Sequence, residues 1–296
     1  MNLYKNMDKG VLVASDMKST RYKVLYWTIF ALMLCYAAIA IIPVLWLMLS
    51  GFKDVEEMYA VPATFFPKEL KLSKLAEVWN TMNFTRYYAN TVYLAAGGVF
   101  WVLLVSGLAG YVISKLKPIG TKIVFSVIFW VMMMPGSMRT VPLFMTFKEF
   151  PIFHFSLLNT FWPCWLMDCA NAFDIILFKN FFDSVPSSLV ESAKIDGAND
   201  FRIFRSIMIP LSAPVFIVVA LFTFNGHLGT FFWPYITISD TAKTVIGVAI
   251  FKLKTSNFTI DYQMIALMFS ILPQLIIFAI FQRYIIGGMN IGAVKG

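Results

Sequence analysis

Long uncharged stretches alternate with short charged segments along this chain. The uncharged windows cover residues 24–52, 87–114, 123–138, 150–167, 206–239 and 262–282. A helix needs roughly 20 apolar residues to cross the hydrocarbon core of a bilayer. Four windows reach that length, and the other two fall short only because of Arg139 and Asp168. The pattern predicts an all-α integral membrane protein with six transmembrane helices, near residues 24–50, 88–114, 122–146, 157–180, 207–235 and 262–285.

Two of these spans contain residues that would interrupt a helix. The predicted fifth span includes "FNGHLGTFFWPYI", with Gly226, Gly229 and Pro234, and the third includes "MMMPGSMRTVPLF". Such breaks are tolerated at membrane depth where the backbone faces protein or a water-filled cavity. They fit either a transport pathway or a helix that is merely bent.

The distribution of Lys and Arg predicts the orientation, because cytoplasmic loops are enriched in both. The tail before the first span carries five basic and two acidic residues, and the loop after the second span has three lysines and no acid. We therefore expect a cytoplasmic N-terminal tail (1–23), a transmembrane domain (24–286) and a cytoplasmic C-terminal tail (287–296). The outer loop is 51–86, with a short amphipathic helix around 70–78, and a charged cytoplasmic loop is 181–206.

Composition narrows the function classes further. The chain is 59% apolar and 14% charged, which lies outside the range of soluble domains. The formal net charge of +8 needs no nucleic-acid partner, because basic cytoplasmic edges account for it. The three cysteines fall inside predicted spans and lack the companion ligands of a metal site. We expect neither a disulfide framework nor a metal or other cofactor.

The cytoplasmic loop contains a short charged helix between two apolar spans. Ser188 and Glu191 have the spacing of a capping box, so we predict a helix over about 186–199. Three residues at intervals of four would lie on one face of this helix, and their side chains become progressively smaller: Leu189, Ala193 and Gly197. The segment is either an ordinary capped interfacial helix or a surface that docks closely against a partner.

The stretch "ESAKIDGANDFRIFRSIMIP" resembles the cytoplasmic signature of ABC importer permeases. That signature is EAA, three residues, G, nine residues, I, any residue, and LP. Here 191–193 stand for EAA with Ser192 in place of Ala, and Gly197 and Ile207 match directly. The final pair is Ile209-Pro210, with Ile in place of Leu. Neither replacement changes the spacing.

The resemblance extends over nearly the whole chain. It lies in the subgroup that imports oligosaccharides and is similar to the smaller maltose permease subunit. The segments that carry it are "LSGFK" (49–53), "FTRYYANTVYLA" (84–95), "LLNTFWP" (157–163), "FDIILFKNFFDSVPSSLVESAKIDGA" (173–198) and "FQRYIIGGMNIGAVKG" (281–296). It implies the type I ABC importer permease fold, multi-pass in a prokaryotic plasma (inner) membrane.

The same resemblance implies the partners. They are a second permease subunit, two cytoplasmic ATPase subunits, and an extracytoplasmic solute-binding protein that delivers an oligosaccharide and docks on the outer loop. The charged helix would be a coupling helix seated in an ATPase groove, formed by Ser188, Leu189, Glu191, Ala193, Gly197 and Ala198. The tail 287–296 would also reach the ATPases, as an extended segment rather than a continued helix, because it contains three glycines.

The chain is not expected to be an enzyme, since it contains no G-x-x-x-x-G-K-[ST] phosphate loop and ATP hydrolysis would fall to its partners. Two other classes are weighed against the importer. An ion-coupled carrier would normally show inverted repeats, and none is visible. A membrane-embedded enzyme or sensor could use Asp168 and Asp174 for acid–base work, but no nucleophile or metal-ligand set accompanies them.

Polar residues in the predicted spans are candidates for the substrate path. Asp168, Asn171 and Asp174 follow one another at intervals of three. Ionisable groups at membrane depth usually face a cavity or a partner, and carboxylates with amides suit sugar hydroxyls. Hydrogen bonding between helices is the alternative. Arg139 would either pair with Asp168 or bind an acidic sugar.

The predicted fifth span adds Asn225, His227 and Trp233 as further candidates for the substrate path. For His227 packing is the preferred interpretation, because a lone histidine on an apolar helix is more often a packing residue than a ligand. A proton relay is not expected, because the chain has only one other histidine, His154.

Overall fold

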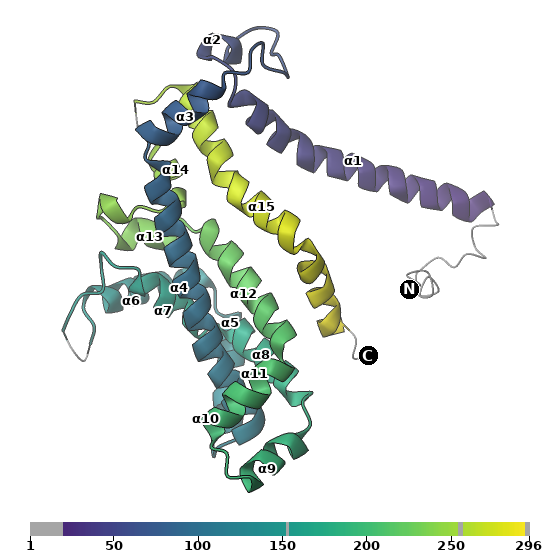
Figure 1. Cartoon of the computed structure of the whole chain (residues 1–296), viewed down its shortest axis with the longest axis vertical. Coiled ribbons are helices and arrows are strands. Elements are labelled where there is room, and N and C mark those ends of the chain that lie inside the picture. Colours follow the sequence, from purple (N-terminus) through teal and green to yellow (C-terminus); the bar gives the residue numbers. More distant parts are fainter. Residues whose placement is uncertain (1–19, 152–153, 254–256, 294–296) are drawn as a thin grey trace.

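The computed structural model describes residues 20–151, 154–253 and 257–293, with side chains described up to residue 282. Within these ranges the chain is helical and contains no strand (Figure 1). Its first part forms α1 (Thr20–Ser50), α2 (Val55–Met58), α3 (Leu72–Thr81), α4 (Phe84–Tyr111) and the π-helical turn η3 (Val112–Leu116). Its middle part forms α5 (Thr121–Met133), α6 (Gly136–Lys148), α7 (Trp162–Cys169), α8 (Ala172–Asp183), α9 (Ser187–Ile195) and α10 (Asp200–Ile203). Its last part forms the π-helical turn η4 (Phe204–Met208), α11 (Ile209–Leu211), α12 (Ala213–Leu228), α13 (Phe232–Thr237), the 3-10 turn η5 (Thr241–Lys243), α14 (Ile246–Leu253) and α15 (Ile260–Ala293).

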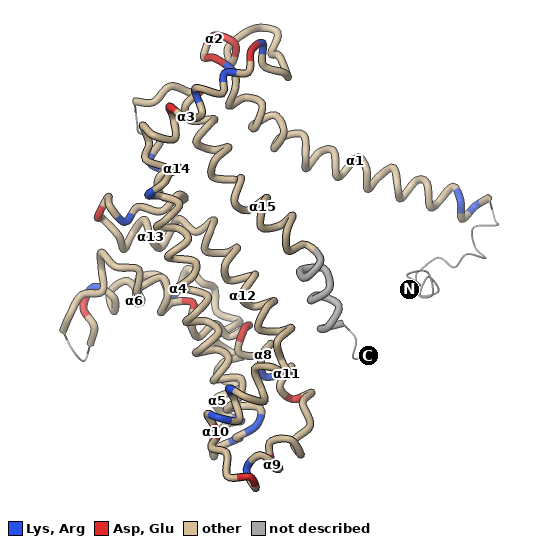
Figure 2. Tube along the Cα trace, in the orientation of Figure 1, with Lys and Arg blue, Asp and Glu red and all other residues tan. Residues whose placement is uncertain are grey.

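Three single helices are long and apolar enough to cross a membrane: α1, α4 continued by η3, and α15 over Ile260–Gln282. Two bent pairs pass the same test as one span each, namely α5 with α6, bent by 107°, and the α10–α11 segment with α12, bent by 83°. These long helices carry few charged residues (Figure 2). The described chain therefore offers three to five spans by length and composition. The predicted fourth span is divided between α7 and α8, and the count of six stays a prediction.

The helix breaks have local causes. Met134 is extended because the residue before a proline disfavours the helical conformation, so α5 ends there and α6 begins after Pro135. Helix α12 ends at Leu228, and α13 begins at Phe232 beyond Gly229. Both interruptions expected from the sequence are confirmed. The 83° bend at Ser212, which lies between two prolines, was not anticipated.

Helix α4 is the axis of the bundle, with α7, α8 and α12 packed around it. A Cβ placed on Gly97 would come within 2.4 Å of the Trp165 ring of α7. One on Gly110 would lie 2.6 Å from the Cβ of Phe178 and 3.0 Å from the backbone nitrogen of Lys179 on α8. Any side chain at either position would displace a neighbour, so these helices approach closely because glycine is present.

Helix α1 diverges from the bundle (Figure 1). Within α1, all of which is described, only Ser50 at the C-terminal end is buried. Apolar side chains along its length stay exposed, for example Met33 at 68%, Tyr36 at 77% and Ile39 at 71%. The described part of the chain therefore leaves this long apolar helix largely uncovered.

The structure describes only part of each predicted tail. The backbone of α15 continues to Ala293, so the prediction of an extended segment after 286 is wrong for 287–293. Glycine within a helix costs up to about 1 kcal/mol, but the helix satisfies every backbone polar group of an apolar stretch. Residues 294–296 and 1–19 lie outside the described residues, and 20–23 form the first turn of α1.

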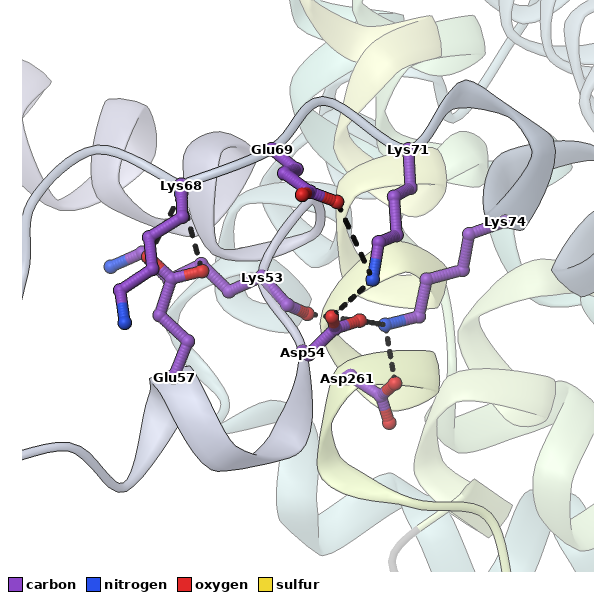
Figure 3. Close-up of polar contacts among 8 residues, drawn as sticks. All are labelled: Lys53, Asp54, Glu57, Lys68, Glu69, Lys71, Lys74 and Asp261. Carbon is purple, nitrogen blue, oxygen red and sulfur yellow. Dashed lines mark hydrogen bonds and ion pairs between the residues drawn. The ribbon is translucent and has the colours of Figure 1, made fainter.

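An ionic cluster fixes the outer loop to α15 (Figure 3). The ammonium of Lys74 on α3, the predicted amphipathic helix, lies 3.2 Å from Asp54 and 2.5 Å from Asp261 at the start of α15. The side chains of Lys74 and Asp261 are 11% and 8% exposed. The pKa of Asp54 is lowered, because Lys71 donates a hydrogen bond to its carboxylate and Lys74 adds a second. One buried lysine therefore connects the loop, α3 and α15.

The substitution Lys74→Met is expected to destabilise this connection by about 3 kcal/mol, because it leaves the buried Asp261 carboxylate without its cation. Thermal unfolding of the purified protein measures the change. The matched control is Lys71→Met, whose exposed ion pair with Asp54 should contribute little. Adding Asp261→Asn to Lys74→Met should restore most of the loss. Equal losses from both single lysine substitutions would contradict this assignment.

Candidate functional site

A cavity of about 320 Å³ lies beside α4, between α7–α8 and α12. Six of its ten lining residues are polar or charged, although the surrounding helices are apolar. The lining residues are Val102, Asp168, Asn171, Phe173, Asp174, Phe222, Thr223, Gly226, His227 and Thr230. Three residues predicted for the substrate path, Asp168, Asn171 and Asp174, are thus brought together at one place.

The break between α7 and α8 positions these three residues. The sequence pattern predicted one continuous helix here, and that prediction is wrong, because α7 ends at Cys169 and α8 begins at Ala172. The Oδ1 atom of Asn171 caps α8 by accepting a hydrogen bond from the Phe173 amide at 2.9 Å. The Ser106 hydroxyl of α4 donates to the free Cys169 carbonyl at 2.8 Å. Two of the backbone groups released by the break, the Phe173 amide and the Cys169 carbonyl, are therefore satisfied within the protein.

His227 faces Asp168 across the cavity. Its Nε2 atom lies 3.5 Å from the nearer Asp168 carboxylate oxygen, and the residue is only 5% exposed. Its Nδ1 atom lies 2.9 Å from the Thr223 carbonyl oxygen. Because a carbonyl only accepts, Nδ1 must carry the hydrogen, and Nε2 of the neutral ring is an acceptor. This Nε2 atom is buried without a hydrogen-bond partner among the described residues.

The position of His227 depends on a glycine of α4. A Cβ on Gly98 would lie 2.5 Å from the His227 Nε2 atom, so a side chain there would push the imidazole aside. From the sequence, His227 was interpreted as a packing residue. The ring is indeed packed, on Gly98, but its free nitrogen points to the predicted carboxylate. No local sequence pattern links residues 98, 168 and 227.

The other predicted path residues lie elsewhere. Arg139 on α6 does not form the predicted ion pair with Asp168; within the described chain, the basic group closest to that carboxylate is His227. Asn225 is exposed and lines a separate cavity with Gln274 of α15. Trp233 packs edge-on against Phe147, with ring centroids 5.9 Å apart. None of these three side chains lines the cavity at Asp168.

The charged segment that was predicted to be cytoplasmic forms α9, at the end of the bundle beside α10 (Figure 1). Pro186 precedes the helix and no side chain caps its first turn, so the predicted capping box of Ser188 and Glu191 is not formed. The helix ends at Ile195, four residues earlier than predicted, because Gly197 adopts a φ of +80°. The Ala198 amide donates to the Ala193 carbonyl at 2.9 Å, which completes a Schellman cap.

The stripe predicted on α9 is also corrected. Ala193 and Ala198 pack inward against the core formed around Phe182 and Phe204, together with the buried Val190. Gly197 is outside the helix, with nothing near its Cβ position. The outward surface instead carries exposed side chains: Leu189 (43%), Glu191, Ile195 (86%) and, from α10, Phe201 (62%). We call these four residues the α9 surface.

A polar junction attaches this segment to α4. The Asp183 carboxylate at the end of α8 accepts hydrogen bonds from Ser114 at 2.6 Å and Lys179 at 2.7 Å. Burial raises the pKa of Asp183, but these two hydrogen bonds outweigh it and leave the pKa below its usual value. The Lys115 ammonium donates to the Val185 carbonyl at 2.6 Å. This junction was not predicted from the sequence, because its partners are some 70 residues apart.

Comparison with known proteins finds relatives that align with most of this chain. It is 29% identical over 270 residues to the diacetylchitobiose uptake system permease protein NgcG of Streptomyces coelicolor, covering 90% of this chain and 87% of the relative. It is 27% identical to the polygalacturonan/rhamnogalacturonan transport system permease protein YtcP of Bacillus subtilis, covering 90% and 97%. It is 26% identical to the arabinooligosaccharides transport system permease protein AraQ of Halalkalibacterium halodurans, covering 95% and 100%.

Two solved structures share the fold. The first is a crystal structure of a bacterial ABC transporter involved in the import of the acidic polysaccharide alginate, with a TM-score of 0.78 and 23% identity over 90% of this chain and 98% of that chain. The second is the bacterial alginate ABC transporter in complex with an alginate pentasaccharide-bound periplasmic protein, with a TM-score of 0.64 and 16% identity over 92% and 97%. At these identities the likeness concerns the fold alone.

The match to a protein family covers well over half of the chain. Residues 86–290, from the first turn of α4 to near the end of α15, match the family described as the binding-protein-dependent transport system inner membrane component. The helical fold, the candidate spans and the relatives agree with that match. The chain belongs to this family of membrane transport components.

Proposed function

We propose that this chain is one of two different permease subunits of an ATP-driven importer for an oligosaccharide or a related glycoside. The observation that carries the proposal is the polar cavity at Asp168 and His227, inside an apolar helix bundle of a binding-protein-dependent transport family. The names of the relatives above describe them as permease proteins of carbohydrate transport or uptake systems, although the carbohydrates they name differ in charge. The chain itself is a transport subunit rather than an enzyme.

The cavity is the part of the substrate path that this chain supplies. Carboxylates, an amide and hydroxyls line it together, so it offers both acceptors and donors to sugar hydroxyls. The break between α7 and α8 brings irregular backbone to this depth, which is tolerated where the chain faces a water-filled space. Three other predicted residues would contact the substrate only if a second subunit or another conformation brought them to the path: Asn225, Trp233 and Arg139.

The α9 surface is the docking site for an ATPase subunit, on the cytoplasmic side of the membrane. Three of its four residues are large exposed apolar side chains, which are costly to leave in water next to a membrane domain. Glu191 adds a negative charge for a basic partner residue. Helix α8 runs from Asp174 at the cavity to Asp183 at the polar junction, so a movement of α9 would be transmitted to the cavity wall.

A second permease subunit would cover helix α1. This helix is apolar on all sides and touches the rest of the chain mainly near its C-terminal end. The binding protein would dock on the outer loop, which the ionic cluster at Lys74 holds in a fixed shape. In one of the two similar structures, a periplasmic protein is in complex with the transporter.

The proposed topology has six spans in a prokaryotic plasma membrane. The pairs α5–α6 and α7–α8 each count as one span, as do α10 to α12 together. An even number of spans puts both termini on one side, and the basic residues before α1 and between η3 and α5 favour the cytoplasm. The backbone of α15 beyond residue 286 would then reach the ATPases as a helix.

The substitution Ile195→Asp is expected to lower ATP-driven uptake about tenfold or more, because it places a charge in the proposed apolar contact. The amount of protein in the membrane should not change, since Ile195 is 86% exposed within the chain. Uptake by membrane vesicles and the ATPase activity of the purified complex measure the effect. The matched control is Ile119→Asp, an equally exposed isoleucine in the loop between η3 and α5. The same loss for both variants would argue against a specific contact at α9.

The substitution Asp168→Asn keeps the shape of the side chain and removes its charge. A hydrogen bond to a charged group contributes about 1.5–3 kcal/mol, so the apparent affinity for transported sugar should fall about 10- to 100-fold. The concentration dependence of uptake measures this change. Ser270→Ala, a partly buried hydroxyl of α15 outside the cavity, is the control. An unchanged affinity and rate in Asp168→Asn would assign this carboxylate to helix packing.

The substitution Gly98→Ala tests the contribution of His227 without touching either polar group. The added methyl group would displace the imidazole, so uptake should fall in the same direction as in Asp168→Asn. Gly107→Ala on the same helix is the control, because its Cβ would meet neighbours only at ordinary contact distances of 3.5 Å or more. Normal uptake by the Gly98 variant would show that the position of His227 does not matter for transport.

A further inference from the structure

The chemistry of the cavity points to the charge of the substrate. Six of its lining residues carry polar groups: Asp168, Asn171, Asp174, Thr223, His227 and Thr230. Two of the six are carboxylates, and none is a lysine or an arginine. We infer that this cavity accepts uncharged saccharides and excludes polyuronates. The inference rests on the proposed function and narrows its substrate class.

The charge of the lining would repel an anionic substrate. In their ionised forms, Asp168 and Asp174 contribute negative charge to the cavity. A protonated His227 would offset Asp168 and leave Asp174. Arg139, which would suit an acidic sugar, acts on Asp168 through its charge but is not among the lining residues. The lining itself therefore offers no guanidinium for a bidentate contact with a carboxylate. A carboxylate on the substrate would therefore meet like charge in a space of low dielectric constant.

Hydrogen-bond acceptors outnumber donors in the lining. The Asp168 and Asp174 carboxylates only accept, and Nε2 of neutral His227 also accepts, because Nδ1 carries the hydrogen for the Thr223 carbonyl. Asn171 has its oxygen occupied by the Phe173 amide, so its NH2 group is left as a donor. Sugar hydroxyls can donate to such a lining, whereas the carboxylate of a uronate cannot.

His227 has an unmet hydrogen bond that a sugar could satisfy. Its Nε2 atom is buried without a hydrogen-bond partner among the described residues, and the Asp168 oxygen at 3.5 Å lies beyond ordinary hydrogen-bond distance. Leaving a buried polar atom unpaired is costly. A hydroxyl beside this pair could donate its single hydrogen to Nε2. The hydroxyl of a saccharide is such a donor, and it carries no charge that the cavity would repel.

The experiment measures the charge preference of the cavity in the assembled importer in membrane vesicles. A reporter cysteine is introduced by Thr223→Cys, with Thr230→Cys as a second reporter if the first does not assemble. Each is treated with a cationic trimethylammonium and an anionic sulfonate methanethiosulfonate reagent of similar size. The chain with only its native cysteines gives the background, and the rates on a small free thiol in solution normalise the two reagents.

We expect the cationic reagent to react about tenfold faster than the anionic one after normalisation. The preference should fall to within about twofold when Asp168→Asn and Asp174→Asn are combined with the reporter. An equal or faster reaction of the anionic reagent would overturn the inference.

The same reporter then distinguishes the substrate class from the proposed function. A galactose trisaccharide and a galacturonate trisaccharide of the same linkage differ only at C6, and each is tested for protection of the cysteine. Protection by the neutral sugar alone supports the inference. Protection by the galacturonate contradicts it and leaves the importer proposal intact. Protection by neither sugar, with the charge preference retained, would instead refute the saccharide path itself.

Discussion

A polar group among apolar helices is costly unless it finds a partner or faces water, and the architecture of this protein follows from that constraint. The break between α7 and α8 frees backbone groups at the depth of the bundle. Asn171 and Ser106 satisfy two of them, from the connecting turn and from α4. The break also brings Asp168 and Asp174 to a common cavity with His227. The site therefore exists because the helix is interrupted, and the interruption persists because its backbone is satisfied.

Close helix packing links this cavity to both ends of the molecule. Glycines of α4 allow α7, α8 and the His227 ring of α12 to approach its backbone, so the cavity has a rigid wall on one side. Helix α8 then extends from the cavity to the polar junction at Asp183, which precedes α9. At the opposite end, Lys74 holds the outer loop to α15. A saccharide path, a docking site for an ATPase and an outer receptor surface would thus be connected by short, rigid elements.

Patterns that depend on neighbouring residues were predictable from the sequence. Long apolar windows located the spanning helices, and Pro135 and Gly229 marked two of the breaks. The signature around Glu191 indicated a short helix, which is present as α9. Its capping was mispredicted, because the spacing of Ser188 and Glu191 permits a capping box without requiring one. Gly197 ends the helix by its positive φ rather than narrowing its face. The pair of Asp168 and His227 depends on tertiary packing through Gly98, which no local pattern encodes.

The importer proposal is tested most directly by tagging this chain in its own membrane, purifying it in mild detergent and identifying the proteins that accompany it by mass spectrometry. We expect an ATPase subunit and a second, different permease subunit in stoichiometric amounts. We also expect sugar uptake by the reconstituted complex that depends on ATP. Recovery of this chain alone, with uptake that continues without ATP, would contradict the importer proposal and favour an ion-coupled carrier.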